Sequence, residues 1–143
     1  MIILDTNVLS EPMRANGHAE VAAWLDRQVT DTLYLTTVNL AKLLLGVALI
    51  PLGLRRSKLE TRLSEVTSTF GAARTLPFDV QAARLFAILV ARARSAGHAI
   101  AVADGQIAAI AAAHGFSVAT RDIAPCVAAG IPVINPWNAP LER

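Results

Sequence analysis

The 143-residue chain has a single cysteine, few aromatic residues and no long uninterrupted apolar run. One cysteine, Cys126, excludes an intrachain disulfide, so we expect a small buried thiol in a reducing, cytoplasmic setting. The longest weakly charged runs, at residues 43–54 and 99–113, are interrupted by Gly, Pro or Asp and fall short of the roughly 18 residues of a membrane span. The first residues lack the basic lead of a secretory signal. We therefore expect no membrane segment.

Motifs of several enzyme classes are also missing. The three histidines, His18, His98 and His114, show no metal-ligand spacing, and we interpret them as loop or helix-end residues. The chain has no glycine-rich phosphate loop and no serine in a nucleophile-elbow context. Aromatic residues make up only 5% of the chain, while alanine supplies much of the 54% hydrophobic fraction. This composition indicates close helix packing, not an aromatic binding surface.

Short apolar runs alternate with helical patterns along the chain. We predict a strand at "MIILD" that leads into a helix start at "TN", and further strands at 33–35, around 74–76, in "FSVATRD" and in "IPVIN". We predict longer helices after 36, over 55–70, over 80–95 and up to Gly115. Thr36 or Thr37 should cap the first of these helices, Asp79 should cap the third, and Gly115 should end the last. This alternation predicts an α/β/α sandwich with a central, mostly parallel sheet, formed by one domain over residues 1–143.

The chain carries a formal net charge of +2. This mild excess permits a polyanionic partner without requiring one. The basic residues gather in two clusters, which are either solvated helix faces or tracks for phosphates: Arg55, Arg56, Lys58 and Arg62, then Arg84, Arg92 and Arg94.

Two of the predicted strands deliver an acid at or just past their carboxyl ends. Asp5 follows "IIL" and Asp122 follows "SVATR", and ligands of open α/β sheets bind outside this edge. Asp104 lies among Ala, Ile and Val near a helix start, where it either stabilises the helix N-terminus or joins a site. Three converging carboxylates would repel one another unless a cation lay between them. Mg²⁺ or Mn²⁺ suits such oxygen ligands, and the chemistry would then be phosphodiester hydrolysis.

Three motifs carry a family resemblance: "MIILDTNVLSEP", "VADGQIAAIAAAHG" and "VATRD". In order and spacing the chain resembles the PIN-domain ribonucleases, specifically the VapC/FitB-type toxins of bacterial toxin–antitoxin pairs. The resemblance implies an α/β/α domain whose acidic pocket binds Mg²⁺ or Mn²⁺ and cleaves RNA. It also implies a homodimer and a small antitoxin partner, through which alone DNA would be contacted.

The resemblance assigns roles to individual residues. Asp5, Asp104 and Asp122 match acids of the family and would be its metal ligands. Asn7, in "DTN", would orient Asp5 or a metal-bound water, and Thr120 would support the site through hydrogen bonds.

Lys42 departs from the family pattern. Members usually have Glu in "AEL", where this chain has "AKL". Lys42 either points to solvent on a polar stripe with Asn39 and Gly46, or it faces the acids. In the second case it would pair with two or three of them. An ammonium cannot coordinate a divalent cation unless it is deprotonated.

These observations lead to two hypotheses of function. The first is a metal-dependent endoribonuclease toxin in which Lys42 weakens metal binding and activity. The second is a catalytically inactive PIN-domain module that still docks an antitoxin. In either case, Lys42 is either the natural residue of a degenerate copy of such a toxin or an inactivating substitution that was introduced.

Overall fold

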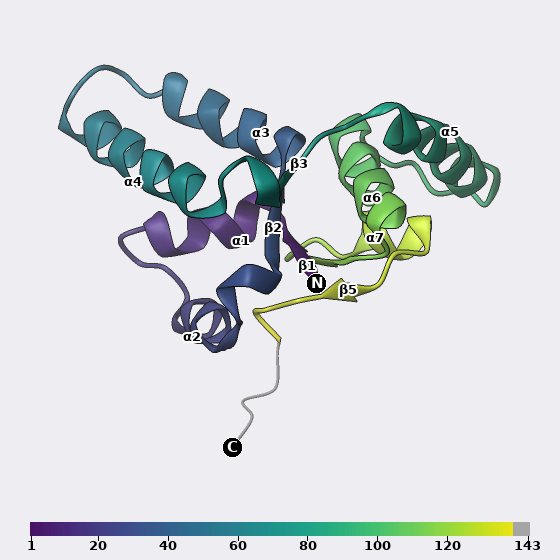
Figure 1. The fold of residues 1–143 in the computed structure, drawn as a ribbon, viewed down its shortest axis with the longest axis horizontal. Helices are drawn as coiled ribbons and strands as arrows, with labels where there is room; N and C mark the ends of the chain where they lie inside the picture. The colour runs from purple at the N-terminus through teal and green to yellow at the C-terminus, as the bar shows by residue number, and fades with distance from the viewer. Residues whose placement is uncertain (139–143) are drawn as a thin grey trace.

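A five-stranded sheet forms the centre of the molecule (Figure 1). The structure, a computed structural model, describes residues 1–138. The strand order is β3-β2-β1-β4-β5, and all four pairings are parallel. The strands are β1 (Ile2–Leu4), β2 (Leu33–Thr36), β3 (Thr75–Leu76), β4 (Ser117–Ala119) and β5 (Val133–Ile134). Every predicted strand is present, and the sheet is wholly parallel where we expected a mostly parallel one.

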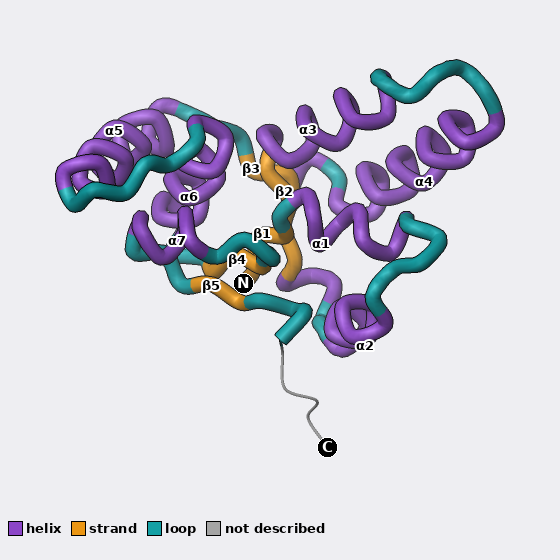
Figure 2. The backbone as a smooth tube through the Cα atoms, turned by 180° about the vertical axis from the view of Figure 1, so that it is seen from behind, coloured by secondary structure: helices purple, strands orange, loops and turns teal. Residues whose placement is uncertain are grey.

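Helices cover both faces of this sheet. One side carries α1 (Thr6–Ser10), α2 (Ala19–Arg27), α3 (Thr37–Ala48) and α4 (Leu54–Phe70), and the other carries α5 (Val80–Ser95), α6 (Val102–His114) and α7 (Ala124–Ala129) (Figures 1 and 2). This arrangement confirms the α/β/α sandwich. Within residues 1–138, no helix has both the length and the apolar character needed to cross a membrane.

Two hydrophobic cores lie on opposite faces of the sheet because successive strand residues point to opposite sides. In β1, Ile3 packs into the core under α5 to α7, whereas Leu4 packs into the core under α1 to α4. Val118 and Ala119 of β4 divide in the same way. A strand buried on both faces needs apolar residues at consecutive positions, which is why "IIL" is an unbroken apolar run.

The predicted helix boundaries are confirmed where a capping residue sets them. The Thr36 hydroxyl accepts from the Asn39 backbone N–H at 3.0 Å, which identifies Thr36 as the N-cap of α3. Asp79 caps α5 by accepting from Ala82 N–H at 2.9 Å. Gly115 ends α6 in the left-handed conformation at φ 68°. The side chains of Thr36 and Asp79, and the left-handed backbone at Gly115, satisfy backbone groups that a helix end leaves without partners.

Helices α5 and α6 pack most closely at Gly105. A Cβ atom at this position would lie 2.9 Å from Phe86 Cε2 and 2.9 Å from Val90 Cγ2. We expect Gly105→Ala to lower the free energy of unfolding by about 1–2 kcal/mol, because overpacking outweighs the better helix propensity of Ala. Gly46→Ala is the matched control, since nothing lies within 4 Å of its added Cβ. Urea unfolding should show the control unchanged or stabilised, and an equal effect at both sites would contradict this packing.

Candidate functional site

The site predicted from the sequence lies at the carboxyl edge of the sheet. Strand β1 pairs with β2, the next strand in the chain, on one side and with β4 on the other. Ligands of open α/β sheets bind where the strand order reverses in this way. Asp5 follows β1 directly and Thr120 follows β4 directly, so two distant segments meet at this point.

Asp5 is the most fully hydrogen-bonded acid at this edge. Its Oδ1 accepts from the Thr6 backbone N–H at 2.7 Å and from Asn39 Nδ2 at 3.1 Å. Its Oδ2 accepts from the Thr120 hydroxyl at 2.8 Å. The bond to Thr6 makes Asp5 the N-cap of α1. Three donors from three separate segments therefore fix the position of this carboxylate.

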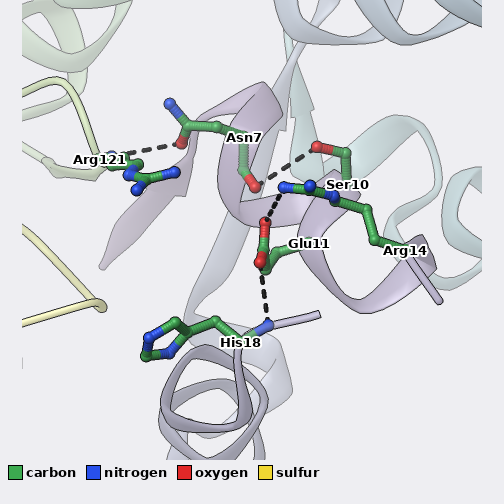
Figure 3. Close-up of polar contacts among 6 residues, drawn as sticks. All are labelled: Asn7, Ser10, Glu11, Arg14, His18 and Arg121. Atoms are coloured by element: carbon green, nitrogen blue, oxygen red, sulfur yellow. Dashed lines mark hydrogen bonds and ion pairs between the residues drawn. The ribbon is translucent and has the colours of Figure 1, made fainter. Parts of the chain in front are cut away.

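Thr120 and Asn7 form a short chain of contacts behind Asp5. Thr120 is 1% exposed and receives a hydrogen bond from Asn7 Nδ2 at 3.4 Å. The amide oxygen of Asn7 accepts from the Arg121 backbone N–H at 3.3 Å (Figure 3). Thr120 lies where we expected a supporting residue. Asn7 reaches Asp5 through Thr120, whereas we expected it to orient Asp5 or a water directly.

Asn39 is a site residue that the sequence analysis missed. It is fully buried, and its Oδ1 accepts from the Thr36 hydroxyl at 2.6 Å while its Nδ2 donates to Asp5. The polar-stripe interpretation is wrong for Asn39, which it placed towards solvent, whereas Lys42 and Gly46 are exposed as it expected. A usable signal was present, because Asn39 lies three residues after the Thr36 cap and three before Lys42, a spacing that puts them on one helix face.

The pKa of Asp104 responds to the charges of Lys42, Asp5 and Asp122. Burial raises the pKa of its carboxyl above the ordinary value of 3.8, the Lys42 ammonium opposes this rise, and the negative charges of Asp5 and Asp122 add to it. A charge changes a neighbour's pKa appreciably only at short range. The three acids and Lys42 therefore share one electrostatic environment, although Asp104 also lies in the first turn of α6, where a negative charge is favourable.

Lys42 takes part in this environment without forming an ion pair. Its side chain is exposed. Within residues 1–138 no acid lies within 4.0 Å of its ammonium, and the ion pairs found there are Arg14–Glu11 and Arg56–Glu60. The prediction that Lys42 pairs with two or three of the acids is wrong. An exposed ammonium keeps its water, and hydration competes with direct pairing.

The acids at this edge can be compared with the ligands that a divalent ion requires. Carboxylate oxygens have the right chemistry for Mg²⁺ or Mn²⁺. Nevertheless, the described part of the chain contains no group of three or more His, Cys, Asp or Glu side chains arranged to hold a metal ion. In this arrangement the acids do not form a ready-made metal site. The metal therefore remains a prediction.

Asp104→Asn should increase the free energy of unfolding at neutral pH. Because the pKa of the folded carboxyl is raised, its ionisation costs more in the folded than in the unfolded protein. The gain should vanish below pH 3.8, grow as the pH rises towards the folded pKa, and stay constant above it. Urea unfolding across this range tests the expectation, with Asp31→Asn as an exposed control. A destabilised Asp104→Asn at neutral pH would contradict it.

Cys126 lies near the acids but is not a reactive thiol. It is buried, and burial together with the charges of Asp5, Asp104 and Asp122 raises its pKa to about 11. The thiol is therefore neutral at physiological pH and is a poor nucleophile. The prediction of a small buried thiol is confirmed.

Two grooves flank α3. One, of about 510 Å³, lies between α3 and α4 and is lined by Leu44, Val47, Ala48, Arg56, Glu60, Leu63, Ser64 and Thr67. The other, of about 340 Å³, is lined by Thr37, Val38, Ala41, Lys42, Leu45 and Gln106. The acids line neither groove, and Lys42 connects the smaller one to their electrostatic environment.

Comparison with known proteins identifies the family of this chain. A model of the PIN domain matches residues 2–130. The chain belongs to the PIN-domain family. This PIN domain is 49% identical over 138 residues to the VapC ribonuclease Y4jK of Sinorhizobium fredii, covering 96% of this chain and 99% of the relative. It is 44% identical over 138 residues to the toxin FitB of Neisseria gonorrhoeae, with the same coverage.

A solved structure agrees with the fold of this PIN domain. The structure of FitAB bound to an IR36 DNA fragment superposes with a TM-score of 0.93 at 40% identity, covering 100% of both chains. The resemblance to the VapC/FitB type, inferred from three short motifs, is thereby confirmed along with the fold.

Proposed function

We propose that this PIN domain is the toxin of a toxin–antitoxin pair, descended from endoribonucleases that use Mg²⁺ or Mn²⁺, and that Lys42 impairs its cleavage of RNA. Two relatives support the lineage, since one is named a ribonuclease and the other a toxin. The protein would act in the cytoplasm as a homodimer of single domains.

Within this proposal Asp5, Asp104 and Asp122 form the acidic centre. Thr120 and Asn39 hold the Asp5 carboxylate, and Asn7 holds Thr120. A bound Mg²⁺ or Mn²⁺ would supply a Lewis acid and an activated water to such a centre. The observation that supports the proposal is the action of the Lys42 charge on Asp104, because it lowers a carboxyl pKa that burial, Asp5 and Asp122 raise.

The impairment follows from charge. The Lys42 ammonium offsets part of the repulsion among the carboxylates, which lowers the electrostatic gain from binding a divalent ion. It also offers no lone pair to the ion. Relative to the Glu that the family usually has here, the charge at this position differs by two units.

Calorimetric titration with Mn²⁺ tests the proposal. We expect Lys42→Glu to bind the ion at least about tenfold more tightly than the unmodified chain, a difference of about 1.4 kcal/mol. Lys58→Glu makes the same charge change at an exposed position on α4 and should leave Mn²⁺ binding unchanged. Equal affinities of the two variants would contradict the role given to Lys42.

A second function is a catalytically inactive module that docks an antitoxin. The groove between α3 and α4 favours it, because its apolar residues Leu44 and Val47 offer a surface for a partner segment. In that case DNA would be contacted only through the antitoxin. A Lys42→Glu variant that neither binds Mn²⁺ nor cleaves RNA, yet still forms a complex with the antitoxin, would favour this alternative.

A further inference from the structure

Arg121 occupies a position next to the acidic centre that the proposed chemistry does not use. It lies between Thr120, which holds Asp5, and Asp122. Its backbone N–H donates to Asn7 Oδ1, so the segment that carries it is tied to α1 (Figure 3). Its side chain is exposed. The main chain of Arg121 is therefore fixed while its guanidinium faces solvent.

An aromatic ring orients this guanidinium. Arg121 Cζ lies over the Trp137 indole, 5.3 Å from the ring centroid. Trp137 is itself fixed, because its backbone N–H donates to Asn135 Oδ1 at 3.0 Å and its ring packs against the core under α1 to α4. A cation–π contact of this kind holds the plane of the guanidinium without neutralising its charge.

The donors of Arg121 remain available, in contrast to those of Arg74 and Arg56. The guanidinium of Arg74 donates hydrogen bonds to the backbone carbonyl oxygens of Thr30, Leu33 and Thr69. Arg56 forms an ion pair with Glu60. Within residues 1–138, Arg121 makes no ion pair, and its guanidinium donates no hydrogen bond to the protein. An arginine that is oriented but not neutralised, beside a candidate nuclease centre, is suited to an external anion.

We propose that Arg121, supported by Trp137, binds single-stranded RNA next to the acidic centre. The guanidinium donors contact a phosphate, and its flat outer face stacks on an unpaired base. A strand held there lies beside Asp5 and Asp122. This inference rests on the proposed ribonuclease function and adds to it the residue that positions the substrate strand.

Fluorescence anisotropy of a short, fluorescein-labelled single-stranded RNA tests this, with the full chain in EDTA so that binding is measured without cleavage. We expect Arg121→Gln to weaken binding about tenfold and to reduce the salt slope by about 0.7, the value for one phosphate contact on a single strand. Arg94→Gln, at an exposed position on α5, should stay within about twofold of the unmodified chain. Circular dichroism melting confirms that each variant is folded.

Arg121→Lys separates charge from shape. It should keep the salt slope but lose affinity, because an ammonium cannot stack. Full affinity in Arg121→Lys, or equal affinities in Arg121→Gln and Arg94→Gln, would overturn this inference and leave the proposed function intact. RNA binding that depends on Arg121, together with a Lys42→Glu variant that never cleaves RNA, would support the inference and contradict the proposed function.

Discussion

Lys42→Glu is expected to raise RNA cleavage by this PIN domain roughly a hundredfold in the presence of Mn²⁺, equivalent to about 2.7 kcal/mol of transition-state stabilisation. The change removes an ammonium that acts on Asp104 and places a carboxylate in the same environment as Asp5 and Asp122. A divalent ion at these acids would then have one more carboxylate ligand and would no longer be repelled by the ammonium. Cleavage of a labelled RNA under single-turnover conditions measures the gain.

Two further variants separate loss of the cation from gain of a ligand. Lys42→Gln removes the charge but adds no carboxylate, so we expect an intermediate rate. Lys58→Glu should cleave no faster than the unmodified chain. If the unmodified chain and Lys42→Glu cleave RNA at equal rates, Lys42 does not impair this centre.

Asn39→Asp should lower the free energy of unfolding by about 3 kcal/mol at neutral pH, the cost of an uncompensated buried charge. Asn39 is fully buried, and its Nδ2 donates to Asp5 at 3.1 Å. The substitution replaces this donor with a second carboxylate of almost the same shape. Repulsion between the two carboxylates, not a cavity, would therefore cause the loss.

Acidification distinguishes this cause from a general packing defect. Two adjacent carboxylates raise the pKa of the pair, so one of them takes up a proton as the pH falls and stability should recover. Asn16→Asp makes the same change at an exposed position and should be neutral at every pH. An Asn39→Asp variant as stable as Asn16→Asp at neutral pH would show that Asn39 does not hold Asp5 in solution.

Most of the fold could be predicted from the sequence because local signals coincide with tertiary structure. Strands buried on both faces have unbroken apolar runs, and Thr36, Asp79 and Gly115 set helix ends through their own hydrogen bonds or backbone conformation. Helices α2 and α7 were not predicted. They have nine and six residues, respectively, and α7 gives too few turns for a recognisable apolar period.

The candidate site could be predicted only in part. Acids at strand ends are visible in the sequence because parallel strands present their carboxyl ends at one edge. The contact between Asn39 and Asp5 joins positions 34 apart, and no local pattern records it. The prediction of ion pairs for Lys42 was wrong because it also depended on the tertiary structure. Solvent exposure in the folded protein decides whether an ammonium keeps its water.

The place of β1 in the sheet has a consequence for the order of folding. This strand is the first to be synthesised, yet it is the middle one, with β2 on one side and β4 on the other. Its second edge stays unpaired until residues 117–119 are available, and the bond between Thr120 and Asp5 spans 115 positions. Contacts of such long range form late because they require closure of a large loop. A nascent chain that ends before β4 therefore contains Asp5 without Thr120 to hold it, and the acidic centre is complete only once residues 117–122 have been made.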